Sequence, residues 1–527
     1  MTYLNTLDTL CHGLFPAGDP GAAVGVIAFD KGGDSLRYAR GFGLANLAKK
    51  IAFTPQTPFR ACSISKQFVC LLVLQLEREG KIDLGAHPSA YLPLLKTFHP
   101  ATTVRHLCQN RSGLRDYWCT AMLTGARAES RFTLDDGAAL IVSLAEPMFA
   151  PGTQYSYSNG NWRILEWIIN AVTGQTLPDL LTRRLFLPAG MRNTGWACDT
   201  SLVLPGNVRG YRRVGETWEE EITRACWSGD AALVTTLDDF LLWEGAMLAR
   251  TLPCSAQLGE AMPNPDGSVG SYAFGINAWQ RDGRWMLWHS GALRGWRMVH
   301  LRFPQDRTSI VVMMNRTENP MPHTLKIAAC LDLPTTWDPV RAIPAAGEAA
   351  LPLPHPPGGI YYSENLGLLA EIVADAGETR LNLGAEAVDM LRTGPSTMAN
   401  SSGFYRLEHR QDSIALHARQ FGWRDIFTRV PPGNGCERLA GRRFENALLK
   451  SALIFSADGS TVHITGPCGE SDTCPVRSLG RDFAAFDCLR AIDETPPGRF
   501  TIHVIDEGGR IEVGCFMARR IIFTRAA

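Results

Sequence analysis

The hydrophobic pattern of the chain changes once, near residue 333. Before that point, helical patterns alternate with short apolar runs, among them AAVGVIAF, WMLWHSG and SIVVMMN. Beyond it, apolar and polar residues alternate over short stretches bounded by turn residues, as in TRLNLG, TVHITG and FTIHVIDEGGRIEVG. The first pattern predicts a domain that mixes helices with a sheet, and the second predicts small antiparallel β domains.

A proline- and glycine-rich segment separates the two patterns. It reads LPTTWDPVRAIPAAGEAALPLPHPPGG, which is the composition of an extended linker. A chain of 527 residues also exceeds the size of a single hydrophobic core. We therefore predict a first domain over residues 1–333, a linker over 334–357, and two β domains over 358–431 and 432–527.

The β-rich part of the chain repeats itself. RDIFTR at 424–429 returns as RIIFTR at 520–525, and YYSEN at 361–365 is echoed by RFEN at 443–446. These matches predict two copies of one barrel-like unit. The second copy is longer, and the excess falls at about 466–497. A long loop within a compact domain is usually functional or disordered.

One helix of the first domain carries a candidate nucleophile. SISKQFVCLLVLQLEREGK is apolar on nearly every face and ends at Gly80, which predicts a buried helix. Side chains three positions apart on a helix are neighbours, so Ser63 meets Lys66 and Ser65 does not. A serine oxygen beside a lysine that has lost its proton is an activated nucleophile.

Composition excludes several classes of partner. Lysine plus arginine and aspartate plus glutamate each number 52, and the chain contains no long basic tract. Nucleic acid and anionic membrane are therefore not expected as main partners. No apolar run is long enough to span a membrane, and the N-terminus lacks the features of a signal peptide. The 14 cysteines form no C-x-x-C pair. We predict a cytoplasmic protein without a metal or a cofactor.

Two further stretches carry polar residues beside apolar elements. In PGTQYSYSNGNW, Tyr157 and Asn159 precede an amphipathic helix, and in WMLWHSGALRGW, His289 lies in a strand that leads to Gly291. Taken singly, each has a structural explanation, as a core aromatic, a helix cap, a strand residue or a turn glycine.

Together the three stretches resemble a known superfamily. Ser63-Ile-Ser-Lys66, Tyr157-Ser-Asn159 and His289-Ser-Gly291 have the order and approximate spacing of S-x-x-K, Y-x-N and K-T-G or H-x-G in serine β-lactamases and penicillin-recognising enzymes. FRACSISKQF and LFLPAGMRNTGW are similar to its class C-like branch. The resemblance implies a multi-domain α+β protein. Its β-lactamase-like domain would combine an antiparallel sheet flanked by helices with a helical subdomain, followed here by two lipocalin-like β-barrels.

The third motif narrows the expected activity. Many relatives have a lysine at its first position, which attracts a substrate carboxylate, whereas His289 is largely neutral at pH 7. β-Lactamase and D,D-carboxypeptidase activities are therefore not expected. An H-x-G motif followed by two barrels resembles the D-aminopeptidase family, which implies removal of D-residues from peptide N-termini and a homodimer.

The resemblance also implies roles for the motif residues. Ser63 would be the nucleophile of acyl transfer, and either Lys66 or Tyr157 would be the general base. Asn159 would hold the substrate amide, and the backbone N–H groups of Ser63 and Ala292 would form the oxyanion hole.

Two positions of the third motif complete the predicted site. His289 would orient Tyr157 or hydrogen-bond the substrate, and Gly291 belongs to the substrate-binding strand. In the family that the chain resembles, a loop of the last barrel enters the site and recognises the substrate's amine. Asp482 and Asp487 are the candidates here, with Asp482 preferred.

Three alternatives stay open beside a D-aminopeptidase that acts on small peptides or amides. A class C-like esterase would be indifferent to a substrate amine, and a D-amidase or D-peptide endopeptidase would accept blocked termini. A ligand-binding module without catalysis is the third, and the presence of every motif residue argues against it.

Overall fold

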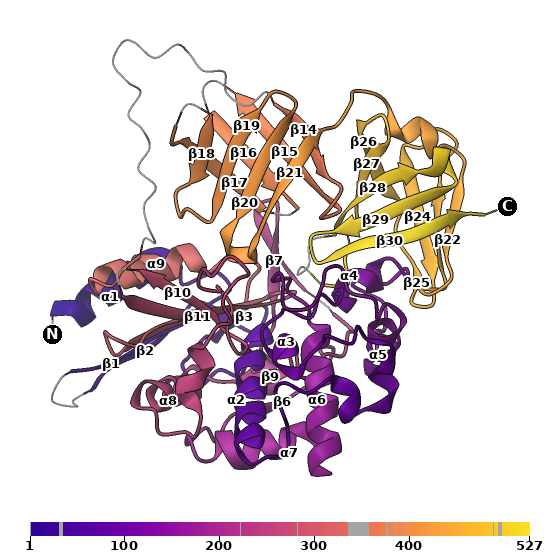
Figure 1. Ribbon diagram of the computed structural model, residues 1–527. Helices are drawn as coiled ribbons and strands as arrows, with labels where there is room; N and C mark the ends of the chain where they lie inside the picture. The colour runs from indigo at the N-terminus through magenta and orange to yellow at the C-terminus, as the bar shows by residue number, and fades with distance from the viewer. Residues whose placement is uncertain are drawn as a thin grey trace.

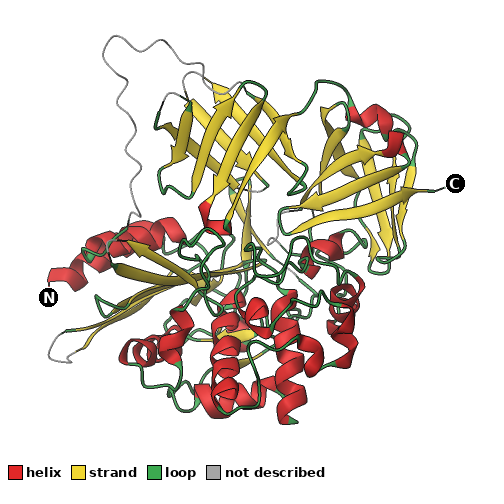
Figure 2. Cartoon of the chain, in the orientation of Figure 1, coloured by secondary structure: helices red, strands yellow, loops and turns green. Residues whose placement is uncertain are grey.

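The computed structural model describes residues 2–30, 35–221, 223–281, 283–335, 358–375, 378–384, 386–394, 396–488, 490–493 and 498–526. One large domain carries two β-barrels that lie side by side against it (Figure 1). Nearly all helices belong to the large domain, and the barrels contain only short helical turns (Figure 2). The predicted linker lies outside the described residues except for its first two.

A six-stranded antiparallel sheet forms the centre of the first domain. Its order is β10 (Asn277–Arg281), β11 (Arg284–Leu293), β12 (Trp296–Phe303), β13 (Thr308–Met314), β1 (Ala22–Phe29) and β2 (Ser35–Phe42). β13 is buried along its whole length, and β1 along most of it. Their almost unbroken apolar sequences follow from this position, because helices cover both faces of the sheet.

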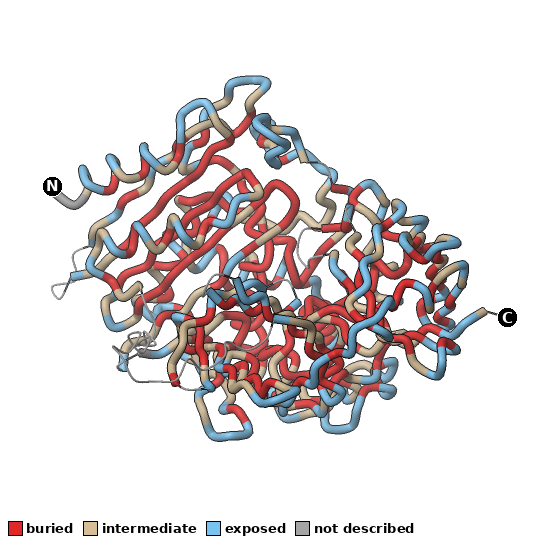
Figure 3. Tube along the Cα trace, turned by 90° about the horizontal axis from the view of Figure 1, so that it is seen from above, coloured by how far each residue is buried: buried red, intermediate tan, exposed pale blue. Residues whose placement is uncertain are grey.

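Helices pack on the two faces in unequal numbers. α1 (Thr2–Leu14) and α9 (Met321–Cys330) cover one face. α8 (Leu237–Ala249) and α2 (Ser65–Arg78) belong to the larger core on the other face. Figure 3 shows this buried interior enclosed by exposed segments. The predicted buried helix after Ser63 is confirmed, since α2 is buried from Ser65 to Leu76.

A helical subdomain extends the side of the core that contains α2. Its helices are α3 (Val104–Cys108), α4 (Tyr117–Met122), α5 (Leu134–Ser143), α6 (Gly160–Thr173) and α7 (Leu177–Leu181). Short strands complete the domain: β3 (Leu44–Asn46), β4 (Ile51–Ala52), β5 (Phe59–Arg60), β6 (Gly195–Trp196), β7 (Tyr211–Val214), β8 (Thr217–Glu220) and β9 (Leu233–Thr235).

The two barrels confirm the predicted fold class. The first is closed by β14 (Gly359–Ser363), β15 (Leu368–Asp375), β16 (Glu378–Leu383), β17 (Glu386–Arg392), β18 (Thr397–Asn400), β19 (Tyr405–Arg410), β20 (Ser413–Ala418) and β21 (Trp423–Arg429). The second contains β22 (Arg443–Asn446), β23 (Ser451–Phe455), β24 (Thr461–Gly466), β25 (Gly469–Glu470), β26 (Cys474–Gly480), β27 (Phe483–Asp487), β28 (Arg499–Ile505), β29 (Arg510–Cys515) and β30 (Ala518–Arg525), and closes through β23 and β24.

The repeated sequences occupy matching places in the two barrels. RDIFTR lies in β21 and RIIFTR in β30, and each of these last strands pairs with the first strand of its own barrel. Other strands of the two barrels, such as β16 and β28, alternate buried and less buried residues, because one face of each strand points into a barrel core.

The second barrel is joined to the first domain by a close backbone contact. A Cβ at Gly125, where φ is +84°, would lie 2.1 Å from the Gly469 carbonyl oxygen, and one at Gly466 would lie 2.8 Å from the Thr124 carbonyl oxygen. The Cys468 N–H donates to that same Thr124 oxygen at 3.1 Å. Glycine at these positions lets the two backbones meet.

A buried ion pair ties α8 to the sheet. Arg302 on β12 donates to both carboxylate oxygens of Glu244 on α8 at 2.8 and 2.7 Å, and Ser309 donates at 2.6 Å. Glu244 is fully buried. Burial opposes its charge, but Arg302 and His300 hold its pKa below the usual range.

Glu244→Gln is expected to destabilise the first domain by about 3–5 kcal/mol, because it leaves the buried Arg302 guanidinium without a countercharge. Calorimetry of the full chain should show the unfolding transition of this domain at a lower temperature. Asp389→Asn, which breaks an exposed pair with Arg380, is the control and should cost at most about 1 kcal/mol. Equal unfolding temperatures for Glu244→Gln and the wild type would contradict this account.

Candidate active site

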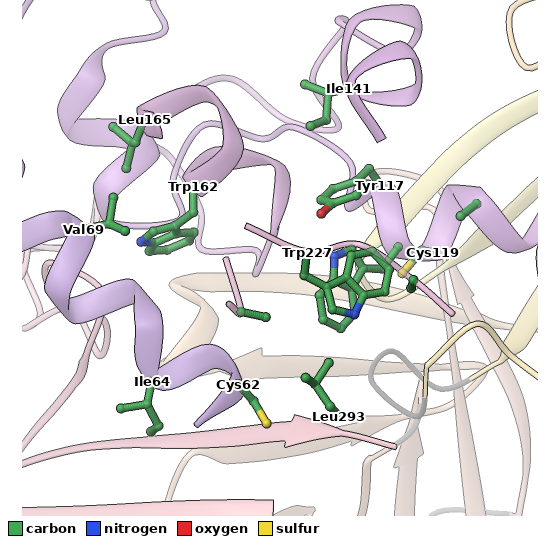
Figure 4. Packing of buried hydrophobic residues seen from close by; sticks show 14 of the residues in the cluster. Cys62, Ile64, Val69, Tyr117, Cys119, Ile141, Trp162, Leu165, Trp227 and Leu293 are labelled. Carbon is green, nitrogen blue, oxygen red and sulfur yellow. The ribbon is translucent and has the colours of Figure 1, made fainter. Parts of the chain in front are cut away.

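The candidate nucleophile lies in a short helical turn before α2. This turn, η1 (Cys62–Ile64), is entered through Cys62 with a left-handed φ of +55°. Figure 4 shows Cys62 beside Leu293 at the end of β11, with Trp162 and Val69 packed further along the helix. Ser63 is 7% exposed, and that small surface lines a cavity.

Lys66 reaches Ser63 from the first turn of α2, as the spacing predicts. Its Nζ lies 2.9 Å from Ser63 Oγ and 2.7 Å from the Asp230 carbonyl oxygen. Nζ also lies 5.0 Å from the ring centroid of Tyr157 and 5.3 Å from that of Trp162. Burial lowers the pKa of Lys66 from 10.5 to about 8, although Asp230 and Asp116 oppose this shift. Roughly a tenth of the amine is therefore neutral at pH 7.

Tyr157 lies on the other side of Ser63. Burial raises the pKa of its phenol well above 10, and a hydrogen bond with Ser63 only partly offsets that rise. The phenol therefore keeps its proton at neutral pH and acts as a donor. Of the two residues that the sequence left open as general base, Lys66 is the one that the electrostatics favour.

Asp116 fixes the orientation of Asn159. The Asp116 Oδ2 accepts from the Asn159 backbone N–H at 2.6 Å and from Nδ2 at 2.8 Å. Asn159 Oδ1 then remains buried without a hydrogen-bond partner among the described residues. Asn159 is not among the described residues that line the Ser63 cavity, so its predicted contact with a substrate amide stays a prediction. Burial raises the pKa of Asp116 to about 6, against the pull of its N–H donors.

Asp230 anchors the carbonyl that holds Lys66. Its Oδ2 accepts from Tyr117 Oη at 2.6 Å and from Trp118 Nε1 at 2.9 Å, and its Oδ1 accepts from the Ser228 N–H at 2.9 Å. All of these groups are buried. The lysine is therefore positioned by a side chain that it does not touch.

Strand β11 approaches the nucleophile through Gly291. β10 pairs with β11 only as far as Trp288, and beyond it the edge of β11 faces η1. A Cβ at Gly291 would lie 2.3 Å from the Ala61 carbonyl oxygen and 3.1 Å from Cys62 Cβ. There is thus no room for a side chain at position 291. The close approach of the strand places Ala292 and Ser63 in the wall of the same cavity.

His289 has a different partner from the expected one. Its Nδ1 lies 2.6 Å from the Ser290 carbonyl oxygen, so Nδ1 carries the proton, and Nε2 accepts from Tyr272 Oη at 3.0 Å. Burial lowers the pKa of His289 to about 3, and the ring stays neutral. In this structure the side-chain hydrogen bond of His289 goes to Tyr272 rather than to Tyr157. The ring lines the cavity, and the alternative role, a hydrogen bond to the substrate, stays a prediction.

Ser63 opens into a cavity of about 440 Å³ that all three domains line. Its wall in the first domain includes Ser63, Tyr157, His289, Ala292, Trp279 and Trp288. The first barrel contributes Glu386, Val388, Phe404, Tyr405, Gln420 and Phe421, and the second contributes Phe516 and Met517. Phe516 and Met517 form the turn between β29 and β30, whereas Gln420 and Phe421 belong to the helical turn η7 (Arg419–Phe421).

The first barrel is held at the cavity by specific contacts. The Tyr155 N–H donates to the Phe421 carbonyl oxygen at 3.0 Å, and Ser271 Oγ donates to the Gln420 carbonyl oxygen. The rings of Trp279 and Phe404 lie 4.6 Å apart across the same boundary. Sequence reasoning did not assign any of these barrel residues to the site.

The described residues of the segment predicted to enter the site pack on the first domain and do not line the cavity. Of the residues 466–497, Leu489 and Glu494–Pro497 are not described, and none of the others lines the cavity. The Arg490 carbonyl oxygen accepts from Ala128, and the Ala491 carbonyl oxygen accepts from Arg294, so this segment packs on the first domain.

Neither of the two candidate acids of that segment lines the cavity. Asp482 pairs with Arg438 at 3.1 Å, and Asp487 pairs with Arg499 at 2.8 Å, both within the second barrel. The proposed role of Asp482 in binding substrate is thus not supported. Asp493 of the same segment is fully buried and acts on Cys62, whose thiol pKa is raised first by burial and then by the Asp493 charge.

Ser65 is structural, as predicted from its place on the helix. Its Oγ donates to the Cys62 carbonyl oxygen at 2.6 Å and accepts from the Leu233 N–H at 3.0 Å. Asp116, Asp230 and Tyr272 were missed. Asp116 had a signal in the sequence, since VRHLCQNRSGLRDY also resembles the superfamily.

Two observations concern other kinds of site. Within the described ranges, no three His, Cys, Asp or Glu side chains are grouped to hold a metal ion. None of the helices in the described part of the chain is long and apolar enough to cross a membrane.

Known families match both parts of the chain. The β-lactamase family matches residues 16–333, and the family described as D-aminopeptidase, domain B matches residues 357–524. D-aminopeptidase of Brucella canis is 32% identical over 547 residues, covering 99% of both chains. D-aminopeptidase of Gluconobacter oxydans is 31% identical and covers 96% of both. The octameric penicillin-binding protein homologue from Pyrococcus abyssi aligns with a TM-score of 0.53 at 18% identity, over 80% of this chain and 99% of its own, and shares the fold.

The pH dependence of Ser63 labelling should report the Lys66 amine. With a neutral fluorophosphonate reagent, which has no titrating group of its own, the labelling rate is expected to rise with pH and level off above an inflection at about 8. The reason is that only the neutral amine takes the serine proton. Lys66→Arg should lose this rise, because arginine stays charged. An inflection above 10 would instead identify Tyr157 as the base.

Gly291→Ala is expected to slow labelling of Ser63 by about 10²–10³-fold, because the new methyl group collides with Ala61 and moves Ala292 away from the reacting carbonyl. The labelling rate and the melting temperature should be measured together. Gly195→Ala, where a Cβ meets nothing within 4 Å, is the matched control. A variant that labels at the wild-type rate would show that the spacing of β11 and η1 is not critical.

Proposed function

The chain belongs to the D-aminopeptidase family, in which a β-lactamase domain precedes D-aminopeptidase domain B, and we propose that it hydrolyses D-residues from the N-termini of small peptides and amides through an acyl-enzyme on Ser63. The preference for the D-enantiomer rests on this membership. Assembly as a homodimer and a cytoplasmic location stay predictions.

One observation carries the chemistry: Ser63 Oγ lies 2.9 Å from the buried Lys66 amine. A lysine with a pKa of about 8 is a competent base near neutral pH. Ser63 and the backbone of Ala292 face the same cavity, where a carbonyl carbon and its developing oxyanion would sit.

Acylation follows from these positions. Ser63 Oγ attacks the scissile carbonyl and passes its proton to neutral Lys66 Nζ, while the N–H groups of Ser63 and Ala292 stabilise the oxyanion. The C–N bond then breaks, and the leaving amine takes the proton of Tyr157. Lys66 returns the proton to Tyr157, which leaves an ester on Ser63 and a neutral lysine.

Deacylation reverses the proton path. Water attacks the ester carbonyl and gives a proton to Lys66, the bond from carbon to Ser63 Oγ breaks, and Ser63 recovers its proton from Lys66. Asn159 is the residue predicted to hold the substrate amide, and Asp116 sets the orientation of its side chain. The product that leaves Ser63 is the free D-amino acid.

The cavity favours short substrates over internal peptide bonds. Residues of both barrels line it, so the barrels bound part of the space in front of Ser63. A cavity of about 440 Å³ accepts a ligand of dipeptide size. This supports an exopeptidase rather than an endopeptidase.

The test compares D-alanine p-nitroanilide, its L-enantiomer and N-acetyl-D-alanine p-nitroanilide, with Ser63→Ala as the control. We expect the wild type to cleave the free D-compound, with kcat/KM at least about 100-fold above those of the other two. Ser63→Ala should be inactive towards all three, because the acyl-enzyme cannot form.

Other outcomes would lead to other functions. Equal cleavage of the acetylated compound would replace the aminopeptidase by a D-amidase or D-peptide endopeptidase. Hydrolysis of simple esters with no amide cleavage would indicate the class C-like esterase. A chain that neither turns over nor labels at Ser63 would be a binding module.

A further inference from the structure

Glu386 is the one acidic side chain among the described residues that line the Ser63 cavity, and no lysine or arginine lines it. It begins β17 of the first barrel and is exposed, and the space to which it is exposed includes the cavity. The carboxylate is thus accessible to a small ligand that enters the cavity.

The partners of Glu386 are neutral. Tyr405 Oη donates to its Oε2, and Gln420 Nε2 donates to the same oxygen at 3.4 Å and to Tyr405 Oη at 3.0 Å. In the described part of the chain no cation pairs with it, and Oε1 receives no hydrogen bond. Desolvation raises the pKa of Glu386, and the two donors counteract this rise.

Aromatic rings line the same cavity. Trp279 lies 4.6 Å from Phe404 and 4.8 Å from Trp288, measured between ring centroids, and the rings of Phe421 and Tyr405 lie 6.2 Å apart. Aromatic faces attract cations, and together with one carboxylate they form the combination that recognises ammonium groups.

A carboxylate that has only neutral partners and faces a cavity attracts a cation that enters it. We infer that Glu386 binds an ammonium group of the substrate, with Tyr405 and Gln420 holding the carboxylate in place. Glu386 is therefore the residue that sets the preference for a charged amine. The inference rests on the proposed function, and it adds a residue of the first barrel to the recognition of a substrate ammonium group.

Two substrate ammonium groups fit this chemistry: the N-terminal one and that of a lysine in the leaving residue. The kinetic test compares Glu386→Gln with the wild type and with Asp389→Asn. Asp389 lies on the same strand, is exposed and pairs with Arg380, so its amide variant is the matched control. The substrates are D-alanine p-nitroanilide and the pair D-alanyl-L-lysine and D-alanyl-L-norleucine.

If the N-terminal ammonium is bound, Glu386→Gln raises KM for D-alanine p-nitroanilide by about 10- to 100-fold, the value of one charge-assisted hydrogen bond. If the leaving residue is bound, that KM is unchanged and the preference for lysine over norleucine disappears. Either result supports the inference, provided that Asp389→Asn behaves as wild type. Wild-type kinetics of Glu386→Gln on all three substrates would overturn it.

Binding without turnover separates this inference from the proposed function. Calorimetry would compare Ser63→Ala with Ser63→Ala/Glu386→Gln, using D-alaninamide, D-alanyl-L-lysine and the N-acetyl form of D-alaninamide at about pH 6.5, where the amines are protonated. A loss of affinity for either charged ligand that is confined to the double variant supports Glu386, even if the wild type hydrolyses none of the substrates above. Equal affinities in the two proteins would overturn the role of Glu386 and leave the proposed function standing on the kinetics.

Discussion

The site is arranged around a single lysine amine that has been removed from water. Lys66 is fully buried, and the amine is balanced between desolvation, which favours its neutral form, and the charges of Asp230 and Asp116, which favour the ammonium. Neither form dominates by far near pH 8, so one group can take a proton and return it. The carbonyl of Asp230, the hydroxyl of Ser63 and two aromatic rings fix where this exchange takes place.

The backbone supports this balance through close packing. α2 is buried from Ser65 to Leu76, so Lys66 cannot turn toward solvent. β11 can pack closely against η1 because Gly291 has no side chain. Asp116 and Asp230 are themselves held by several N–H and O–H donors, which keeps their charges at fixed distances from the amine. Catalytic geometry is thus a consequence of how the core is packed rather than of flexible side chains.

Local sequence spacing predicts the parts of this site that are local in the fold. Ser63 and Lys66 share a helix face, and the structure brings them together as their spacing requires. The change of pattern near residue 333 and the repeated strand sequences likewise predicted a mixed domain followed by two barrels. Tyr272, which pairs with His289, and Glu386 meet the site only through folding and docking, and no spacing in the chain encodes either meeting. The length excess at 466–497 did not reveal which neighbours that segment packs against, and its candidate acid Asp482 pairs with Arg438 in the structure.

The three domains that line the cavity contribute different kinds of residues to the site. The groups that make and break bonds come from the first domain, whereas much of the wall that a substrate must fit comes from the barrels. A substitution in β17 or η7 can therefore retune which molecules are accepted while the proton-transfer machinery stays intact. The barrels are therefore the part of the molecule in which substrate specificity can change without a change in the groups that transfer protons.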